Sequence, residues 1–366
     1  MTIETTEDRP LTADEMQEIR ERAKTIFQDL EQQSAQTLSP ASWVRPDADA
    51  SWLDNRKDRC QYFDTHGFLK VSNFVDTSTV QALKDQMAQL TNNNWDPSAD
   101  LDTFGTDRKS NTARGDYFLD SGNRVHFFAE VDALENNELK PEFQNDKLAA
   151  LNKAGHGMHT VPGAFCDYTA SSHVRELVTD LGWQDPVVPQ SMYIFKQPRI
   201  GGTVHSHQDS TFLYTTPKQS CLGLWLALDD ATLENGCLWV RPGSHQEPVR
   251  RQFVRNPDYF ESNKTDAPKL TFDKHDDNPD VPWEGSDSLP NAGLLLEAGF
   301  VPVECRAGDV VAFGGQLDHL SLPNFSKLPR HTFQLHLVEG PRAGVTWSPK
   351  NWLQYPPGVP FVSLLS

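Results

Sequence analysis

The pattern of apolar and polar positions changes character about halfway along the chain. In the first part, apolar residues recur every three or four positions, which is typical of amphipathic helices. One such stretch follows Thr12 and Glu15, whose spacing is that of a capping box, and it predicts a helix of roughly 20 residues. Its apolar positions are Met16, Ile19, Ala23, Ile26, Phe27 and Leu30. Further helices are expected around 80–90 and 173–181, with a short strand at 68–71.

From about residue 187, short apolar runs of strand-like composition follow one another closely. An Asn-Gly pair at 235–236 lies between two of these runs and predicts a hairpin turn. Helices first and strands afterwards predict a mainly β protein with flanking helices, built as an antiparallel barrel or sandwich. The runs are 187–195, 211–215, 222–228, 237–240, 301–305, 310–313 and 331–338.

These patterns divide the chain into three expected parts. Residues 1–55 form an N-terminal helical extension and linker, and 56–345 form the main domain. A polar, Asp- and Asn-rich insertion interrupts that domain at 250–298, and 346–366 form a C-terminal tail. For the N-terminal helix, packing on its own barrel and packing on a partner both remain open, and so does the oligomeric state.

Charge and composition limit the partners. The 366 residues carry a formal charge of -18, which argues against nucleic acid or an anionic membrane surface as a partner. It also disfavours a strongly anionic substrate, unless local basic residues override the global field. The five cysteines are scattered without CxxC spacing, which indicates reduced thiols. The acidic N-terminus does not resemble a signal peptide, and no apolar run has transmembrane length, so a cytoplasmic protein is expected.

The sharpest chemical pattern is His207-Gln208-Asp209, followed about 110 residues later by His319. Positions two apart in a strand face the same way, so His207 and Asp209 are expected to reach one ion together. Two histidines and one carboxylate leave coordination sites open, which suits an iron(II) oxygenase. His205 lies on the same face of the expected strand as His207 and Asp209, so by spacing alone it is an alternative ligand. We expect instead that it lies near the substrate, beside the ligands or in an exposed loop.

Arg330 adds a second chemical feature eleven residues beyond His319. A guanidinium binds a carboxylate through two parallel hydrogen bonds. The distal carboxylate of 2-oxoglutarate needs such a partner while its keto acid end chelates iron. The alternative is a surface arginine paired with a nearby acid.

Taken together, the motifs resemble the phytanoyl-CoA dioxygenase (PhyH) family, in particular the branch called phytanoyl-CoA dioxygenase domain-containing protein. The resemblance covers roughly residues 58–340. It is carried by residues 191–196, His207-Gln208-Asp209, Trp225, 235–238, Pro242-Gly243-Ser244-His245, His319-Leu320-Ser321, Asn324 and Arg330, and upstream by 116–119 and 151–156.

The resemblance implies a double-stranded β-helix (jelly-roll, cupin-like) fold with Fe(II), and with 2-oxoglutarate and O2 as co-substrates. Residue by residue it implies His207, Asp209 and His319 as iron ligands and Arg330 and Ser321 as co-substrate contacts. Lys153, Met192 and Trp225 match further co-substrate contacts; without the resemblance, an ordinary lysine and core filling would be favoured. The insertion at 250–298 lies where loops that cover a substrate are expected.

The resemblance also implies the reaction: hydroxylation of an aliphatic C–H bond of a small organic substrate, with release of succinate and CO2. Desaturation, cyclisation or epimerisation at the same iron remain open, as does a catalytically silent ligand-binding protein on this fold. A halogenase needs the carboxylate position vacant for halide, and Asp209 fills it.

Overall fold

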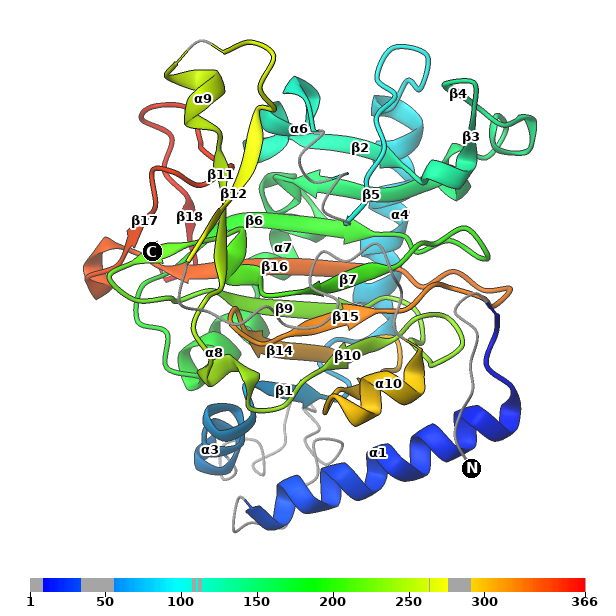
Figure 1. Cartoon of the computed structure of the whole chain (residues 1–366), viewed down its shortest axis with the longest axis vertical. Helices are drawn as coiled ribbons and strands as arrows, with labels where there is room; N and C mark the ends of the chain where they lie inside the picture. The colour runs from blue at the N-terminus through cyan, green and yellow to red at the C-terminus, as the bar shows by residue number, and fades with distance from the viewer. Residues whose placement is uncertain are drawn as a thin grey trace.

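The computed structural model describes residues 9–33, 56–106, 110, 114–262, 264–275 and 291–365. Two antiparallel sheets form its centre (Figure 1). The eight-stranded sheet has the order β1-β14-β9-β16-β6-β5-β2, with β18 also paired to β6. Its strands are β1 (Phe68–Val71), β2 (Val125–Ala129), β5 (Leu151–His156), β6 (Pro186–Ile194), β9 (Leu222–Ala227), β14 (Val310–Gly314), β16 (Thr332–Glu339) and β18 (Val362–Ser363).

The four-stranded sheet has the order β13-β10-β15-β7 and carries the sharpest sequence motif. From β6 to β10 and again from β13 to β16, successive strands of the two sheets alternate, as the double-stranded β-helix requires, and this predicted fold is confirmed. The strands are β7 (Val204–His207), β10 (Leu238–Val240), β13 (Val301–Val303) and β15 (His319–Ser321). Three smaller pairs are β3 (Leu134–Glu135) with β4 (Glu138–Leu139), β8 (Thr215–Thr216) with β17 (Thr346–Trp347), and β11 (Arg251–Arg255) with β12 (Leu270–Lys274).

Helices flank the sheets (Figure 1). The predicted capping box is present at the start of α1, where the Thr12 N–H donates to Glu15 and the Glu15 N–H donates back to the Thr12 hydroxyl. Ile19 and Ala23 of α1 are buried, and the helix packs along α10 and β13 of its own chain. The helices are α1 (Ala13–Gln33), α3 (Arg56–His66), α4 (Thr77–Asn94), α6 (Asp116–Asp120), α7 (Ala164–Thr169), α8 (Ser172–Asp180), α9 (Pro257–Phe260) and α10 (Ala292–Glu297). No helix in the ranges given above is long and apolar enough to cross a membrane.

Two sequence expectations were wrong in their details. The Asn235-Gly236 turn does not close a hairpin, because β9 and β10, on either side of it, belong to different sheets. Gly236 instead adopts a left-handed conformation (φ 81°) where the chain crosses from one sheet to the other. The run at 211–215 is not a strand: a 3-10 turn, Asp209–Thr211, precedes the two-residue strand β8. The part of the predicted extension and linker at 34–55 lies outside the described residues.

Candidate active site

His207, Asp209 and His319 meet at one point. β7 and β15 pair so that His207 and His319 are direct register partners, and their ring centroids are 4.2 Å apart. Asp209 Oδ1 lies 3.4 Å from His207 Nε2 and 3.6 Å from His319 Nε2. One ligand atom from each residue lies within 4.8 Å of the others, a spacing that a single metal ion can bridge.

The structure brings the three predicted side chains together at the end of β7. The strand β7 ends at His207, and Asp209 is the first residue of the 3-10 turn that follows. Gln208, between the two residues, keeps an extended backbone (φ -108°, ψ 129°), so side-chain alternation still places His207 and Asp209 on the same side. The Phe212 and Leu213 N–H groups both donate to the Asp209 carbonyl and close the turn.

Both histidines are oriented by backbone carbonyls. His207 Nδ1 lies 2.7 Å from the His205 carbonyl oxygen, and His319 Nδ1 lies 3.0 Å from that of Leu317. A carbonyl only accepts, so each Nδ1 carries the hydrogen and the Nε2 lone pair faces Asp209. Burial lowers the pKa of His319 to about 4, which keeps this imidazole neutral at pH 7. Neutral imidazoles are the form that binds metal.

Gln208, which lies between His207 and Asp209 in the sequence, is fixed by hydrogen bonds to segments outside the site. Gln208 bridges three segments: its amide nitrogen donates to the carbonyls of Gln316 (2.9 Å) and Pro248 (3.3 Å), and its amide oxygen accepts from the Arg250 N–H. Gln208 is fully buried. It therefore fixes the β7 turn against the chain that leads into β15.

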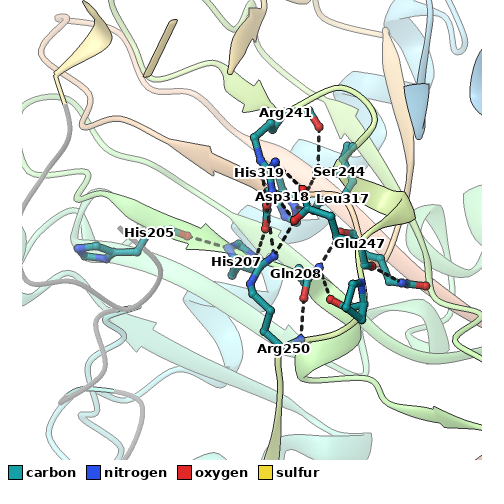
Figure 2. Close-up of polar contacts among 12 residues, drawn as sticks. His205, His207, Gln208, Arg241, Ser244, Glu247, Arg250, Leu317, Asp318 and His319 are labelled. Carbon is teal, nitrogen blue, oxygen red and sulfur yellow. Dashed lines mark hydrogen bonds and ion pairs between the residues drawn. The ribbon is translucent and has the colours of Figure 1, made fainter. Parts of the chain in front are cut away.

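Asp318, immediately before His319, is the centre of a buried ion-pair network (Figure 2). Its carboxylate accepts from Arg241 and Arg250, and its backbone N–H donates to the Ser244 hydroxyl at 2.9 Å. Glu247 pairs with both arginines in turn. The Pro-Gly-Ser-His segment of the sequence motif thus holds the backbone that carries His319.

A cavity opens beside the three side chains. Among its lining residues are all eight predicted site residues: Lys153, Met192, His207, Asp209, Trp225, His319, Ser321 and Arg330. The larger sheet supplies its floor, because residues paired in register share a face. Met192 of β6, Gln334 of β16 and Trp225 of β9 form one row.

Arg330 lies in the cavity wall, away from any carboxylate that could pair with it directly in the described ranges. Its side chain is 2% exposed, and within the described chain no carboxylate lies within ion-pair distance of it. Its hydrogen bonds to Thr332 and Ser321 are long, at 3.4 and 3.5 Å, and among the described residues Nε has no hydrogen-bond partner. The guanidinium lies 5.3 Å from the centroid of Trp225. Burial lowers the pKa of Arg330 to about 10, so the charge persists at neutral pH and favours a carboxylate ligand.

Lys153 faces the cavity from β5 and is likewise buried. Its Nζ lies 3.0 Å from His156 Nε2 and 3.3 Å from the ring centroid of Phe104. Burial, with a smaller contribution from Arg114, holds the pKa of Lys153 well below its ordinary value. An anion bound beside Lys153 would favour its charged form.

His205 also lines the cavity, but its ring is not part of the three-residue cluster, and its Nδ1 lies 2.9 Å from the Thr106 hydroxyl. Sequence reasoning missed other lining residues. Arg114 lies over Phe104, Arg251 comes from the predicted insertion, and Trp352 comes from the predicted tail. No local motif marks these residues, because the fold brings them together from distant segments.

Comparisons with known proteins agree with this geometry. The profile of the family described as phytanoyl-CoA dioxygenase (PhyH) matches residues 63–332. Phytanoyl-CoA dioxygenase of Arabidopsis thaliana is 37% identical over 298 residues, which cover 81% of this chain and 93% of that one. Phytanoyl-CoA dioxygenase domain-containing protein 1 of Mus musculus is 38% identical over 307 residues, which cover 83% and 96%. Among solved structures, the epimerase SnoN, determined with Fe3+, alpha ketoglutarate and nogalamycin RO, has a similar fold (TM-score 0.50, 15% identity, 84% and 92% coverage).

Proposed function

The chain belongs to the phytanoyl-CoA dioxygenase family, and on that premise we propose that it is an Fe(II)- and 2-oxoglutarate-dependent dioxygenase that hydroxylates an aliphatic C–H bond of a small organic substrate. Family membership makes it an oxidoreductase. The observation that carries the finer proposal is the convergence of His207, Asp209 and His319 beside the buried guanidinium of Arg330 in one cavity.

The donor set fits iron(II). Two neutral imidazole nitrogens and one carboxylate oxygen form the facial arrangement of non-haem iron oxygenases, which leaves positions open for other ligands. His207, Asp209 and His319 would hold the metal. Asp209 fills the position that a halogenase leaves vacant, so hydroxylation is favoured over halogenation.

The cavity also fits 2-oxoglutarate, which carries two carboxylates. Arg330 would hold the distal one through its planar guanidinium, with the Ser321 hydroxyl beside it. Trp225 and Met192 would pack against the short carbon chain, and Lys153 would face the same co-substrate. Iron, 2-oxoglutarate and dioxygen together supply the oxidising chemistry, with succinate and CO2 as co-products.

The protein's own contribution is positioning and exclusion of water. Phe104, Phe212 and Trp352 line the cavity with apolar surface, which favours a C–H-bearing group over solvent. Gln208 and Asp318 fix the backbone of the metal-binding residues from behind. No side chain is required to transfer a proton in this reaction class, so the cavity needs no general base.

Succinate release tests the proposal. Purified protein, reconstituted with Fe(II) under nitrogen, is given 2-oxoglutarate and then oxygen, with and without a panel of small organic acids, amines and alcohols. We expect succinate formation that depends on Fe(II) and is absent in Asp209→Ala. One panel member should raise the rate and gain one oxygen atom from O2. Equal succinate formation by the wild type and Asp209→Ala would contradict the proposal.

A further inference from the structure

The two oxygens of Asp209 face different partners. Oδ1 faces the Nε2 atoms of His207 and His319. Oδ2 points the other way and lies 3.1 Å from Nε2 of a fourth histidine, His336. His336 is 2% exposed and belongs to β16, on the floor of the larger sheet. The carboxylate is therefore in polar contact on one side with a residue outside the three-residue cluster.

The far side of His336 is fixed as well. His336 and Gln190 are register partners across the β16–β6 pair, and the Gln190 amide nitrogen lies 3.4 Å from His336 Nδ1. An amide N–H only donates, so in this arrangement Nδ1 accepts and Nε2 is the ring nitrogen that faces Asp209. Nε2 lies within ion-pair distance of Asp209 Oδ2, and that oxygen forms no hydrogen bond within the described chain.

A glycine makes this approach feasible. Gly223 of β9 is the other register partner of His336. A Cβ atom at Gly223 would lie 3.3 Å from Asp209 Oδ2 and 2.7 Å from a ring carbon of Phe313. Because position 223 has no side chain, the Asp209 carboxylate can sit against the sheet beside His336.

We propose that His336 is a positioning residue that holds Asp209 Oδ2, so that only Oδ1 is presented to the metal. The inference rests on the proposed function, since it assumes that the three-residue cluster holds a metal. Without this contact the carboxylate can rotate about its Cβ–Cγ bond or present both oxygens. Groups that orient a metal ligand from behind typically contribute about 10- to 100-fold in metal affinity.

Two substitutions separate positioning from packing. His336→Leu fills the space but has no donor. His336→Gln has an amide nitrogen that can take the place of Nε2. Zn(II) affinity is measured by competition calorimetry on metal-free protein at pH 7.5, and thermal unfolding of the metal-free form monitors the fold. His159→Asn is the matched control, because His159 is also buried and bonded to a side chain of β6 (Ser191) but lies outside the cavity lining.

We expect His336→Leu to weaken Zn(II) binding about 10- to 100-fold and His336→Gln to retain most of the wild-type affinity, with the control unchanged. The absorption bands of the Co(II)-loaded protein should shift in His336→Leu alone. Wild-type affinity in His336→Leu would overturn the proposal, as would equal weakening in both variants, which would indicate packing. Complete loss of binding, as expected for His319→Ala, would make His336 a ligand and also overturn it. If the wild type itself binds no metal, the metal site fails, and this inference fails with it.

Discussion

Replacement of Arg330 by methionine should change ligand binding and folding stability in opposite directions. The guanidinium is buried, has long hydrogen bonds to Ser321 and Thr332, and faces no carboxylate in the described chain. In the ligand-free protein this buried charge lowers the stability of the fold, whereas with 2-oxoglutarate bound it forms an ion pair with the distal carboxylate. Methionine has a similar length and no charge.

The expected loss of affinity for 2-oxoglutarate follows from the loss of its ion pair with Arg330. Truncation of one partner of a buried, hydrogen-bonded charge pair costs on the order of 2–5 kcal/mol. At about 1.4 kcal/mol per factor of ten, the dissociation constant for 2-oxoglutarate should rise roughly 30- to 4000-fold. Arg330→Lys should recover only part of this, because an ammonium lacks the planar two-donor edge.

The stability change follows from the pKa. Burial lowers the pKa of Arg330 from 12.5 to about 10, which corresponds to about 3 kcal/mol against the charged form in the folded state. The unfolded chain holds this proton more tightly, so the cost is fully present below pH 10 and fades as the pH rises above it. Removal of the charge should therefore offset the lost packing, and ligand-free Arg330→Met should be at least as stable as the wild type.

Calorimetric titration with 2-oxoglutarate and thermal unfolding, both on Zn(II)-loaded protein, measure the two effects. Arg124→Met serves as a control, because Arg124 is largely exposed in a surface ion pair with Asp120. The reasoning is refuted if Arg330→Met binds 2-oxoglutarate as tightly as the wild type does. A loss of several kcal/mol in ligand-free stability would mean that the guanidinium is already compensated.

Three further predictions concern the surroundings of the metal site and the core. His205→Ala should keep wild-type Zn(II) affinity while His207→Ala loses it; the reverse result would identify the wrong histidine as ligand. Gly223→Ala should lower the free energy of unfolding by about 1–3 kcal/mol, as overpacking does, and weaken metal binding, whereas Gly115→Ala, with open space around it, should do neither. Burial lowers the pKa of His159 from 6.5 to about 4, so the unfolded state binds more protons in that window, and the free energy of unfolding should fall as the pH drops from 6.5 to 4. Denaturant titrations across this range should show a smaller fall in His159→Asn; an unchanged slope would contradict the assignment.

The strands of the barrel could be predicted where their side chains are apolar on both faces. Runs such as those of β9 and β14 are continuous and buried, and they were predicted nearly at their observed bounds. No strand was predicted where β5 lies. Lys153 and His156 make that strand polar in sequence, because their side chains line the cavity. A rule that looks for apolar alternation does not detect such a strand.

The Asn235-Gly236 pair correctly predicted a turn, but the hairpin pairing of the strands on either side of it was wrong. Gly236 does adopt the left-handed conformation expected of it. Strand pairing, however, depends on residues far apart in the sequence, and in this topology the next strand joins the opposite sheet. The N-terminal helix shows the converse case. Its own amphipathic pattern and cap predicted it well, and only the structure shows that it packs on α10 and β13.

In the candidate site, too, some residues could be predicted from the sequence and others could not. His207, Asp209, His319 and Arg330 are marked by spacing and by resemblance to a family, and the structure brings them to one cavity. His336 carries no such mark in the sequence. Its contact with Asp209 arises from the register of β16 against β6 and β9, which the sequence alone does not specify.

The central claim is that His207, Asp209 and His319 hold iron next to a 2-oxoglutarate site formed by Arg330. Crystals grown without oxygen, with Fe(II) and 2-oxoglutarate, test it directly by anomalous scattering at the iron edge. The account predicts one strong peak within bonding distance of His207 Nε2, Asp209 Oδ1 and His319 Nε2, with the distal carboxylate of 2-oxoglutarate on Arg330. A peak at other ligands, or 2-oxoglutarate bound away from Arg330, would contradict it.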